Sequence, residues 1–287
     1  MTDPSAGTCR ALIVGVGQAQ TLTIERGDRG EPGLYRFDAL AGVASDVATY
    51  DRLIPQLIQP PMTLQRTILD EPDETSPQRI LTSLGTLVDE TAERDVLVLV
   101  LVGHGMTVPD KDGDEREGNP ADTLDEAFVA TGGIIVDDEF QVILKEVPSS
   151  AMVLQIADCC SADSVFKGPA PTSSTSTKVD PAPADIASLE PDDGPVCISI
   201  FASASWGTAK EIRYGQGKRG ALTSGLHTQF RQSPEQDSLA GWFQRTSDWV
   251  QQMTQGRQVP LLRYRNAKAS LLDLPPTIGA LSSAERR

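Results

Sequence analysis

Seven consecutive aliphatic residues, Val96–Val102, restrict the possible fold more than any other feature of the sequence. A segment of this length without a polar side chain suits a strand that is covered on both faces, as in a parallel sheet. Three further short aliphatic runs share this character: Ala11–Val16, Met152–Ala157 and Cys197–Ala202. Together the four runs predict a mainly parallel β-sheet with other elements packed against both of its faces.

Apolar residues at helical spacing predict helices between and after these runs. Ser76 precedes Pro77, which matches an N-cap followed by proline at the first helical position. The predicted helices are Phe37–Ile58, Pro77–Glu93, Asp137–Glu146, Leu222–Arg231 and Ser238–Met253. Alternating strands and helices predict an α/β fold with helices on both faces of the sheet, and such sheets bind ligands at the carboxyl ends of their strands.

We find no internal repeat and expect one domain over residues 1–287. Gly168–Gly194 interrupts the pattern, because it is rich in Pro, Ser, Thr, Ala and Asp and nearly free of large apolar residues. Such a composition buries too little surface to offset its ordering entropy. We predict a flexible linker at 168–194, between the third and fourth aliphatic runs; a surface loop without function is the alternative.

The net charge of −15 argues against a nucleic-acid binder and against adhesion to anionic membranes, because both need clustered Lys and Arg. It fits cationic partners or simple solubility. No apolar stretch reaches the length of a membrane span, and Met1–Arg10 lacks the apolar core of a signal peptide. The four cysteines match no zinc-binding spacing, so we expect a reducing, cytoplasmic location and no metal.

Reactive side chains follow two of the aliphatic runs. His104 stands between two glycines just beyond Val96–Val102, and Asp158, Cys159 and Cys160 follow Met152–Ala157. Carboxyl ends of neighbouring parallel strands meet at one edge of the sheet, so a Cys and a His can form a nucleophile and base pair there. Each cysteine alone also fits a small buried residue. For the other histidine, His227, we expect no role.

Ordered stretches of the chain resemble the caspase-like cysteine peptidases, most closely the metacaspase and bacterial caspase-homologue branch. The similarity extends over about residues 10–265. The matching stretches are Arg10–Val16, Leu40–Val47, Val96–Gly105, Asp110–Glu115, Asp125–Glu126, Ile135–Glu139, Ile156–Cys160, Ile200–Glu211 and Gly217–Thr223. The resemblance implies a caspase-like fold and a peptide-bond hydrolase acting through an acyl-enzyme.

The same resemblance implies a role for individual residues. His104 matches the general base, and Cys160 matches the nucleophile because it is the second residue after Asp158. The backbone N–H groups of Gly105 and Cys160 match the oxyanion hole. Asp46 and Asp158 match the acidic floor of the specificity pocket, which implies cleavage after Arg or Lys, with Arg better suited to bidentate pairing. A helix N-cap is the structural alternative for Asp46.

Three positions depart from the family pattern. Ser161–Asp163 stands where the family usually has His-Ser-Gly, Val102 replaces a serine, and Thr107 replaces a glutamine. These changes motivate an alternative function, a catalytically inactive caspase-like scaffold that binds partners. A second alternative is a hydrolase of another fold that uses Cys159 with His104.

Calcium is a further implication of the resemblance, through acids that match Asp125, Asp137 and Asp138. The matching acid after the nucleophile is absent, with Lys167 nearby, so we prefer solvated acids and a helix start as the explanation. An EF-hand reading of Asp110–Asp114 fails, because Glu115 occupies the position that requires glycine.

Lys167 and Lys178 are candidate cleavage sites in the linker, cut by the protein itself or by an upstream protease. Substrates would be proteins or peptides with basic residues. Closeness to the metacaspases favours a monomer, and bacterial relatives of this kind often serve defence pathways. No organic cofactor is implied.

Overall fold

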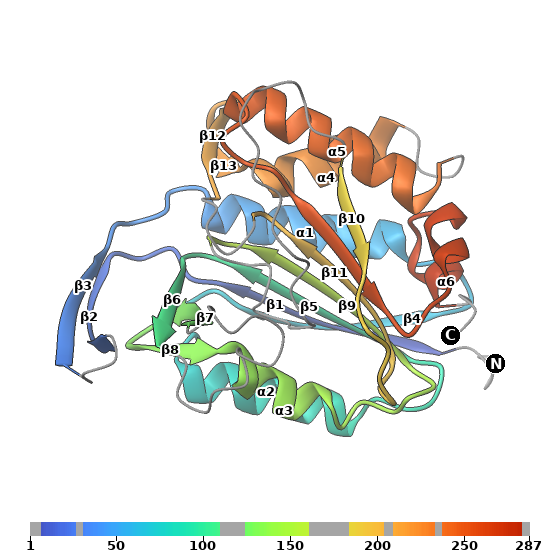
Figure 1. Cartoon of the computed structure of the whole chain (residues 1–287), viewed down its shortest axis with the longest axis horizontal. Helices are drawn as coiled ribbons and strands as arrows, with labels where there is room; N and C mark the ends of the chain where they lie inside the picture. Colours follow the sequence, from blue (N-terminus) through green and yellow to red (C-terminus); the bar gives the residue numbers. More distant parts are fainter. Residues whose placement is uncertain are drawn as a thin grey trace.

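A seven-stranded sheet in the order β10-β14-β11-β9-β5-β1-β4 forms the centre of the computed structural model (Figure 1). The structure describes residues 7–26, 31–109, 124–160, 184–203, 209–232 and 237–282. The strands of this sheet are β1 (Thr8–Gly15), β4 (Thr63–Leu69), β5 (Val96–Val102), β9 (Met152–Asp158), β10 (Asp185–Ser188), β11 (Val196–Phe201) and β14 (Leu261–Arg265). All neighbours pair in parallel except β11 with β14. The predicted α/β fold with a mainly parallel sheet is confirmed.

The four predicted strands are the central ones, and β5 shows why. Its valines Val96, Val98, Val100 and Val102 belong to the hydrophobic cluster on one face, and its leucines Leu97, Leu99 and Leu101 belong to the cluster on the other. Every residue of the strand is buried. A strand in this position needs apolar side chains at every residue, which is the pattern that the sequence carries.

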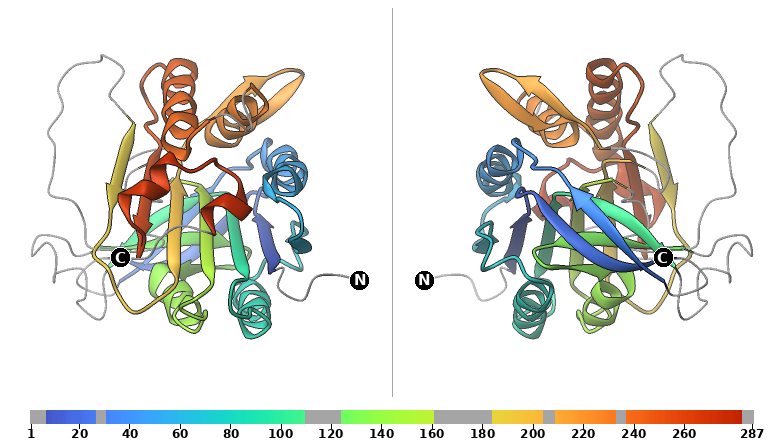
Figure 2. Two further views of the ribbon diagram at one scale, coloured as in Figure 1. Left: turned by 90° about the vertical axis from the view of Figure 1, so that its right-hand side faces the viewer. Right: turned by 90° about the vertical axis from the view of Figure 1, so that its left-hand side faces the viewer.

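Helices cover both faces of the sheet, as predicted (Figure 2). The valine side of β5 packs with α1 (Val43–Leu57), α4 (Ala221–Gln232) and α5 (Leu239–Thr254), followed by the short η2 (Ala269–Asp273) and α6 (Ile278–Leu281). The leucine side packs with α2 (Pro77–Asp89) and α3 (Asp137–Leu144). Ser76 caps α2 by accepting a hydrogen bond from the Arg79 N–H at 3.4 Å, as its sequence predicts.

Three small sheets gather at one end of the molecule (Figure 1). They are the hairpin β2 (Gln20–Arg26) with β3 (Glu31–Phe37), the three strands β6 (Gly105–Pro109), β7 (Leu124–Ala130) and β8 (Gly133–Val136), and the hairpin β12 (Glu211–Tyr214) with β13 (Gly217–Gly220). Because β6 begins three residues after β5 ends, this is the end where the carboxyl termini of the parallel strands lie. It is therefore the end where a ligand is expected.

The predicted linker at 168–194 is wrong in its C-terminal part. Asp185–Ser188 form β10, which pairs in parallel with β14 at the edge of the sheet. Ile186 packs against the core, and the Asp185 carboxylate pairs with Arg263 at 2.9 Å. One apolar side chain and one ion pair attach this strand to the sheet, although the composition of residues 168–194 does not indicate a strand. Residues 161–183, which include the candidate cleavage sites Lys167 and Lys178, lie outside the described residues.

One predicted helix differs in its N-terminal bound. The first predicted helix begins at Val43 and not at Phe37, because Phe37 is the last residue of β3. Among the described residues, no helix combines the length and the apolar character needed to cross a membrane.

Candidate functional site

The carboxyl ends of β5 and β9 lie side by side. Val102 is the register partner of Asp158, and the Gly103 N–H donates to the Asp158 carbonyl at 3.3 Å. His104 follows directly on one strand and Cys159 and Cys160 follow on the other. The prediction that these reactive residues leave neighbouring strand ends is confirmed.

Gly105 lies against Cys160. A Cβ atom added to Gly105 would collide with the carbonyl oxygen of Cys160 and would lie 3.0 Å from its carbonyl carbon. Only glycine fits where one backbone approaches another this closely. The contact brings together the two residues whose N–H groups were predicted to form an oxyanion hole.

A backbone carbonyl orients the His104 ring. Nε2 of His104 lies 2.8 Å from the carbonyl oxygen of Asp38, just after β3. A carbonyl oxygen only accepts hydrogen bonds, so Nε2 carries the proton and Nδ1 keeps a lone pair. The Phe37 ring lies against the imidazole, with centroids 5.4 Å apart. The half-buried ring is thus held in the tautomer that can accept a proton at Nδ1.

Cys160 is the more accessible of the two adjacent cysteines. It is half-buried, whereas Cys159 is fully buried in the hydrophobic cluster on the α2 and α3 side. Burial raises the pKa of both thiols; the nearby Asp158 adds to this for Cys160, and Lys210 opposes it. Cys160 is therefore a protonated thiol at neutral pH that needs a base, and Cys159 is placed as a packing residue.

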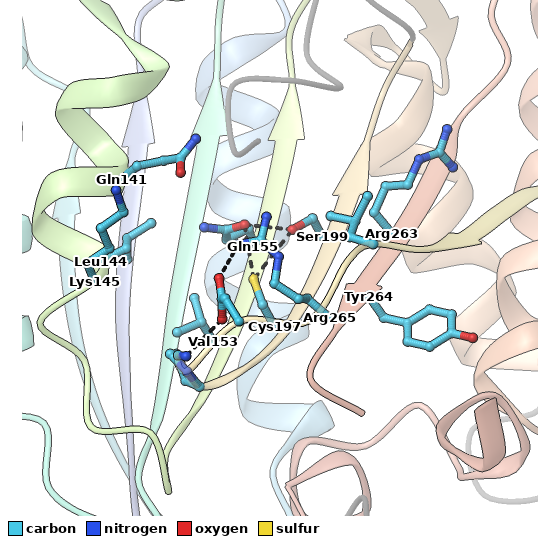
Figure 3. A pocket seen from close by; sticks show the side chains of 14 residues that line it. Gln141, Leu144, Lys145, Val153, Gln155, Cys197, Ser199, Arg263, Tyr264 and Arg265 are labelled. Atoms are coloured by element: carbon cyan, nitrogen blue, oxygen red, sulfur yellow. Dashed lines mark hydrogen bonds and ion pairs between the residues drawn. The ribbon is translucent and has the colours of Figure 1, made fainter. Parts of the chain in front are cut away.

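Of the remaining cysteines, Cys9 is buried and Cys197 is partly buried. Burial raises the pKa of Cys9 to about 12. Cys197 lines a cavity of about 80 Å³ near α3 (Figure 3), where it donates to Gln155 Oε1 at 3.4 Å. Ser199 donates to the same oxygen at 2.6 Å. This hydrogen-bonded network gives Cys197 a structural role.

Asp46 and Asp158 are both buried, with 2% and 5% of their surface exposed. Oδ2 of Asp46 accepts from the Gly220 N–H at 2.7 Å, and Oδ2 of Asp158 accepts from the N–H and hydroxyl of Thr223 at 3.0 and 2.6 Å. Among the described residues, no group hydrogen-bonds to Oδ1 of Asp46. Burial and the charge of Asp158 raise the pKa of Asp46 to about 8, and burial raises the pKa of Asp158. Asp46 is the fourth residue of α1, and Gly42 occupies the N-cap position. The alternative that Asp46 is the helix N-cap is therefore wrong.

Glu211 is a third carboxylate that sequence reasoning did not single out. Its charge contributes to the raised pKa of both Asp46 and Asp158. Its Oε1 accepts from the Gly42 N–H at the start of α1, and its Oε2 lies 3.5 Å from Lys218 Nζ. The residue ends one of the stretches that carry the family resemblance, and that position was the available signal.

Asp125, Asp137 and Asp138 form a compact acidic cluster. One oxygen from each lies within 4.8 Å of the others. Burial first, and then Glu126, Asp138 and Asp125, raise the pKa of Asp137 to about 9. Asp125 and Asp137 are buried, so the expectation of solvated acids is wrong. Carboxylate oxygens at this density suit a hard cation such as Ca²⁺.

A sequence profile of the metacaspase peptidase C14 domain matches residues 10–169, more than half of the chain. This chain belongs to the metacaspase family of C14 peptidases. Two metacaspases of Arabidopsis thaliana are similar: metacaspase-3 is 30% identical over 142 residues, and metacaspase-4 is 31% identical over 99 residues. These matches take in 46% and 33% of this chain but only 37% and 23% of those relatives.

Solved structures show the same fold at low sequence identity. Protein GSU0716 from Geobacter sulfurreducens superimposes with a TM-score of 0.60 at 17% identity, over 94% of this chain and 98% of that one. Caspase-1 from Spodoptera frugiperda superimposes with a TM-score of 0.52 at 13% identity, over 92% and 97% of the two chains. The metacaspase-family chain thus has the caspase-like fold that its sequence resemblance implies.

The departures from the family pattern fall in different surroundings. Val102 is buried in the hydrophobic cluster on the α1 side, and Thr107 is half-buried in β6. Ser161–Asp163 lies outside the described residues. In this metacaspase the substitution at Val102 is therefore absorbed by core packing.

Proposed function

We propose that this metacaspase-family protein is a cysteine endopeptidase that cuts after arginine or lysine. The observation that carries the proposal is the pair of buried carboxylates of Asp46 and Asp158, which interact with each other, with Asp158 two residues before Cys160. Buried acids with raised pKa values, and the Asp46 Oδ1 that lacks a hydrogen bond within the described part of the chain, favour a cationic ligand. A guanidinium pairs with two carboxylates better than an ammonium does, so Arg is preferred over Lys.

In the proposed mechanism, Cys160 gives its thiol proton to Nδ1 of His104 as the sulfur attacks the scissile carbonyl carbon. The resulting oxyanion accepts hydrogen bonds from the N–H groups of Gly105 and Cys160. His104 then protonates the leaving amine, and the C–N bond breaks to leave a thioester. Water, deprotonated by His104, hydrolyses the thioester and releases the Cys160 thiol. The Asp38 carbonyl stabilises the imidazolium through Nε2 at 2.8 Å.

Glu211 is the third carboxylate of the proposed pocket. Its charge adds to the negative potential at Asp46 and Asp158, which favours a basic P1 side chain. Gly220 and Thr223, which donate to the two aspartates, hold them in place. Protein substrates with basic residues follow from this chemistry.

The proposal is tested by turnover of fluorogenic peptides that differ only in an Arg, Lys or Asp before the cut bond. We expect the fastest turnover with Arg, slower turnover with Lys and no turnover with Asp. A preference for Asp would refute the pocket assignment. An arginyl chloromethylketone should label Cys160 stoichiometrically; a folded protein that is neither labelled nor active would instead favour the inactive scaffold. Activity that survives Cys160→Ala but not Cys159→Ala would favour the hydrolase that uses Cys159.

We also propose that the acidic cluster of Asp125, Asp137 and Asp138 binds a calcium ion. The three carboxylates would hold it and would join β7 to the start of α3. When bound, the cation neutralises charges that otherwise repel one another. No step of the peptidase mechanism passes through it.

Cleavage at Lys167 or Lys178 remains our proposal for maturation. Long incubation of wild-type protein, followed by electrophoresis, should give two fragments, while Cys160→Ala stays intact. A single full-length band in both samples would exclude self-cleavage.

A further inference from the structure

A surface hollow of about 660 Å³ lies between α1, α4 and the β12–β13 hairpin. Figure 2 shows the hairpin standing over one end of α1 and beside α4. Three guanidinium groups line the hollow, one from each of these elements: Arg52, Arg219 and Arg231. His227 lies among them on α4. No lining residue carries a carboxylate.

This concentration of positive charge is unusual for a chain with a net charge of −15. Other arginines, such as Arg66, Arg245 and Arg263, pair with carboxylates. Within the described part of the chain, the three arginines of the hollow form no ion pair. The charges of Arg52 and Arg231 are therefore available to a ligand, whereas the charge of Arg219 also acts on Asp46, whose pKa it lowers.

Two of the lining side chains are held in place. Arg219 donates from Nε to Ser45 Oγ at 2.8 Å, and its guanidinium carbon lies 5.5 Å from the centre of the Tyr214 ring. The Tyr214 hydroxyl lies 3.0 Å from Thr228 Oγ1. Because these contacts fix Arg219 through Nε, its terminal nitrogens stay free to donate to a bound group.

His227 reports the positive potential of the hollow. Partial burial, and then the charges of Arg231, Arg219 and Arg52, lower its pKa from the ordinary value. The other polar residues that line the hollow are Gln56, Tyr214, Thr228 and Gln232, and none of them has a carboxylate. An anion seated in the hollow would offset the three guanidinium charges and raise that pKa.

We propose that this hollow is a binding site for an anion that carries several phosphate groups. Guanidinium groups pair bidentately with phosphate oxygens, and three of them spread over a hollow of this size suit more than one phosphate. The two sources of this chemistry are a free oligophosphate, such as a nucleoside triphosphate, and a segment of protein phosphorylated at adjacent residues. The proposal is independent of peptidase activity.

The test uses full-length Cys160→Ala protein, so that self-cleavage plays no part, with EDTA present to remove divalent cations. Tripolyphosphate, ATP and a peptide with two adjacent phosphoserines are titrated separately by calorimetry at low salt. We expect saturable binding of one molecule per chain for at least one probe. Tighter binding of the first two indicates a free oligophosphate, and tighter binding of the peptide indicates a phosphorylated protein. Failure of all three probes to saturate would overturn the proposal.

Matched variants separate local recognition from general charge. Arg52→Gln with Arg231→Gln removes two charges from the hollow, and Arg79→Gln with Arg257→Gln removes two exposed charges elsewhere. We expect the first pair to weaken binding about tenfold or more, and the second pair by less than about twofold. Equal weakening by both pairs would overturn the proposal. Thermal unfolding of both variants checks that they fold alike.

Proton NMR of the two histidines supplies an independent readout. Anion binding should raise the pKa of His227 and leave the His104 resonances in place. Saturable binding without any change at His227 would place the anion elsewhere and would contradict the assigned site.

Discussion

The backbone of Gly105 approaches the carbonyl group of Cys160 so closely that no side chain fits between them. We predict that Gly105→Ala lowers kcat/KM on Arg peptides by about 10²- to 10³-fold, because displacing either N–H group removes an oxyanion donor. The collision should also cost about 1–3 kcal/mol of stability. Peptide turnover and chemical denaturation measure the two effects.

Gly85→Ala is the matched control for this substitution. Gly85 lies in α2, and nothing is within 4 Å of an added Cβ. Alanine should raise stability by about 0.5–1 kcal/mol there and leave turnover unchanged. If Gly105→Ala keeps full activity, the two N–H groups do not form the oxyanion hole.

The charge state of Asp46 should set a pH dependence for basic substrates. Its pKa of about 8 means that the carboxyl becomes ionised as pH rises through this value. Binding of a P1 arginine should therefore tighten over the same range, seen as a falling KM. Asp46→Asn should raise KM at least about tenfold and remove the dependence.

The Cys160 thiol also ionises as pH rises, so the two effects must be separated. Alkylation by neutral iodoacetamide reports the thiol alone, because the reagent does not use the pocket. We expect Asp46→Asn to change the KM profile much more than the alkylation profile. Identical KM profiles for the variant and the wild type would contradict the assignment of Asp46.

Glu211→Gln tests the third carboxylate of the pocket. Glutamine keeps an oxygen for the Gly42 N–H but removes the charge that acts on Asp46 and Asp158. We expect KM for Arg peptides to rise several-fold, about 3–10-fold, with little change in kcat. Asp89→Asn, an exposed acid at the end of α2, is the control of equal charge change. If both variants raise KM equally, Glu211 acts only through the net charge of the protein and has no specific role in the pocket.

The central sheet could be predicted from the sequence, because a strand that is covered on both faces has an apolar side chain at nearly every position. Val96–Val102 has an aliphatic side chain at each position, and both faces of the strand are covered. Edge strands carry less information: Thr63–Leu69 contains exposed Gln65 and Arg66, and Asp185–Ser188 has one large apolar residue. Their positions depend on partners elsewhere in the chain, such as Arg263 for Asp185.

The candidate site likewise contains residues that the sequence indicates and residues whose positions depend on the fold. His104, Cys160, Asp46 and Asp158 have reactive side chains at strand ends or in recognisable stretches, so the sequence indicates them. Asp38 contributes only a carbonyl oxygen, which every residue has, and its place beside His104 depends on the path of β3. Burial of Asp137 likewise depends on how β7 packs against α3, and its sequence position at a helix start indicates exposure instead.

The buried acids predict how stability changes with pH. Asp46 and Asp137 have pKa values of about 8 and 9 in the folded protein, above the ordinary 3.8 of an unfolded aspartate. Between pH 4 and 9 the folded state therefore binds more protons than the unfolded state, so the free energy of unfolding falls as pH rises. Urea denaturation in EDTA should show this fall. Asp137→Asn should flatten it, and an unchanged slope would mean that Asp137 is ionised in the folded protein.

Calcium should reverse the part of this loss that comes from the acidic cluster. A bound cation favours the ionised form of Asp125, Asp137 and Asp138, so Ca²⁺ should raise Tm more at pH 8 than at pH 6. Mg²⁺ should have a smaller effect, because it demands stricter octahedral geometry and gives up its waters reluctantly. Asp137→Asn should lower the affinity for Ca²⁺ by about tenfold or more, while Asp89→Asn leaves it unchanged. A Tm that does not respond to Ca²⁺ at either pH would show that these carboxylates are neutralised by protons alone.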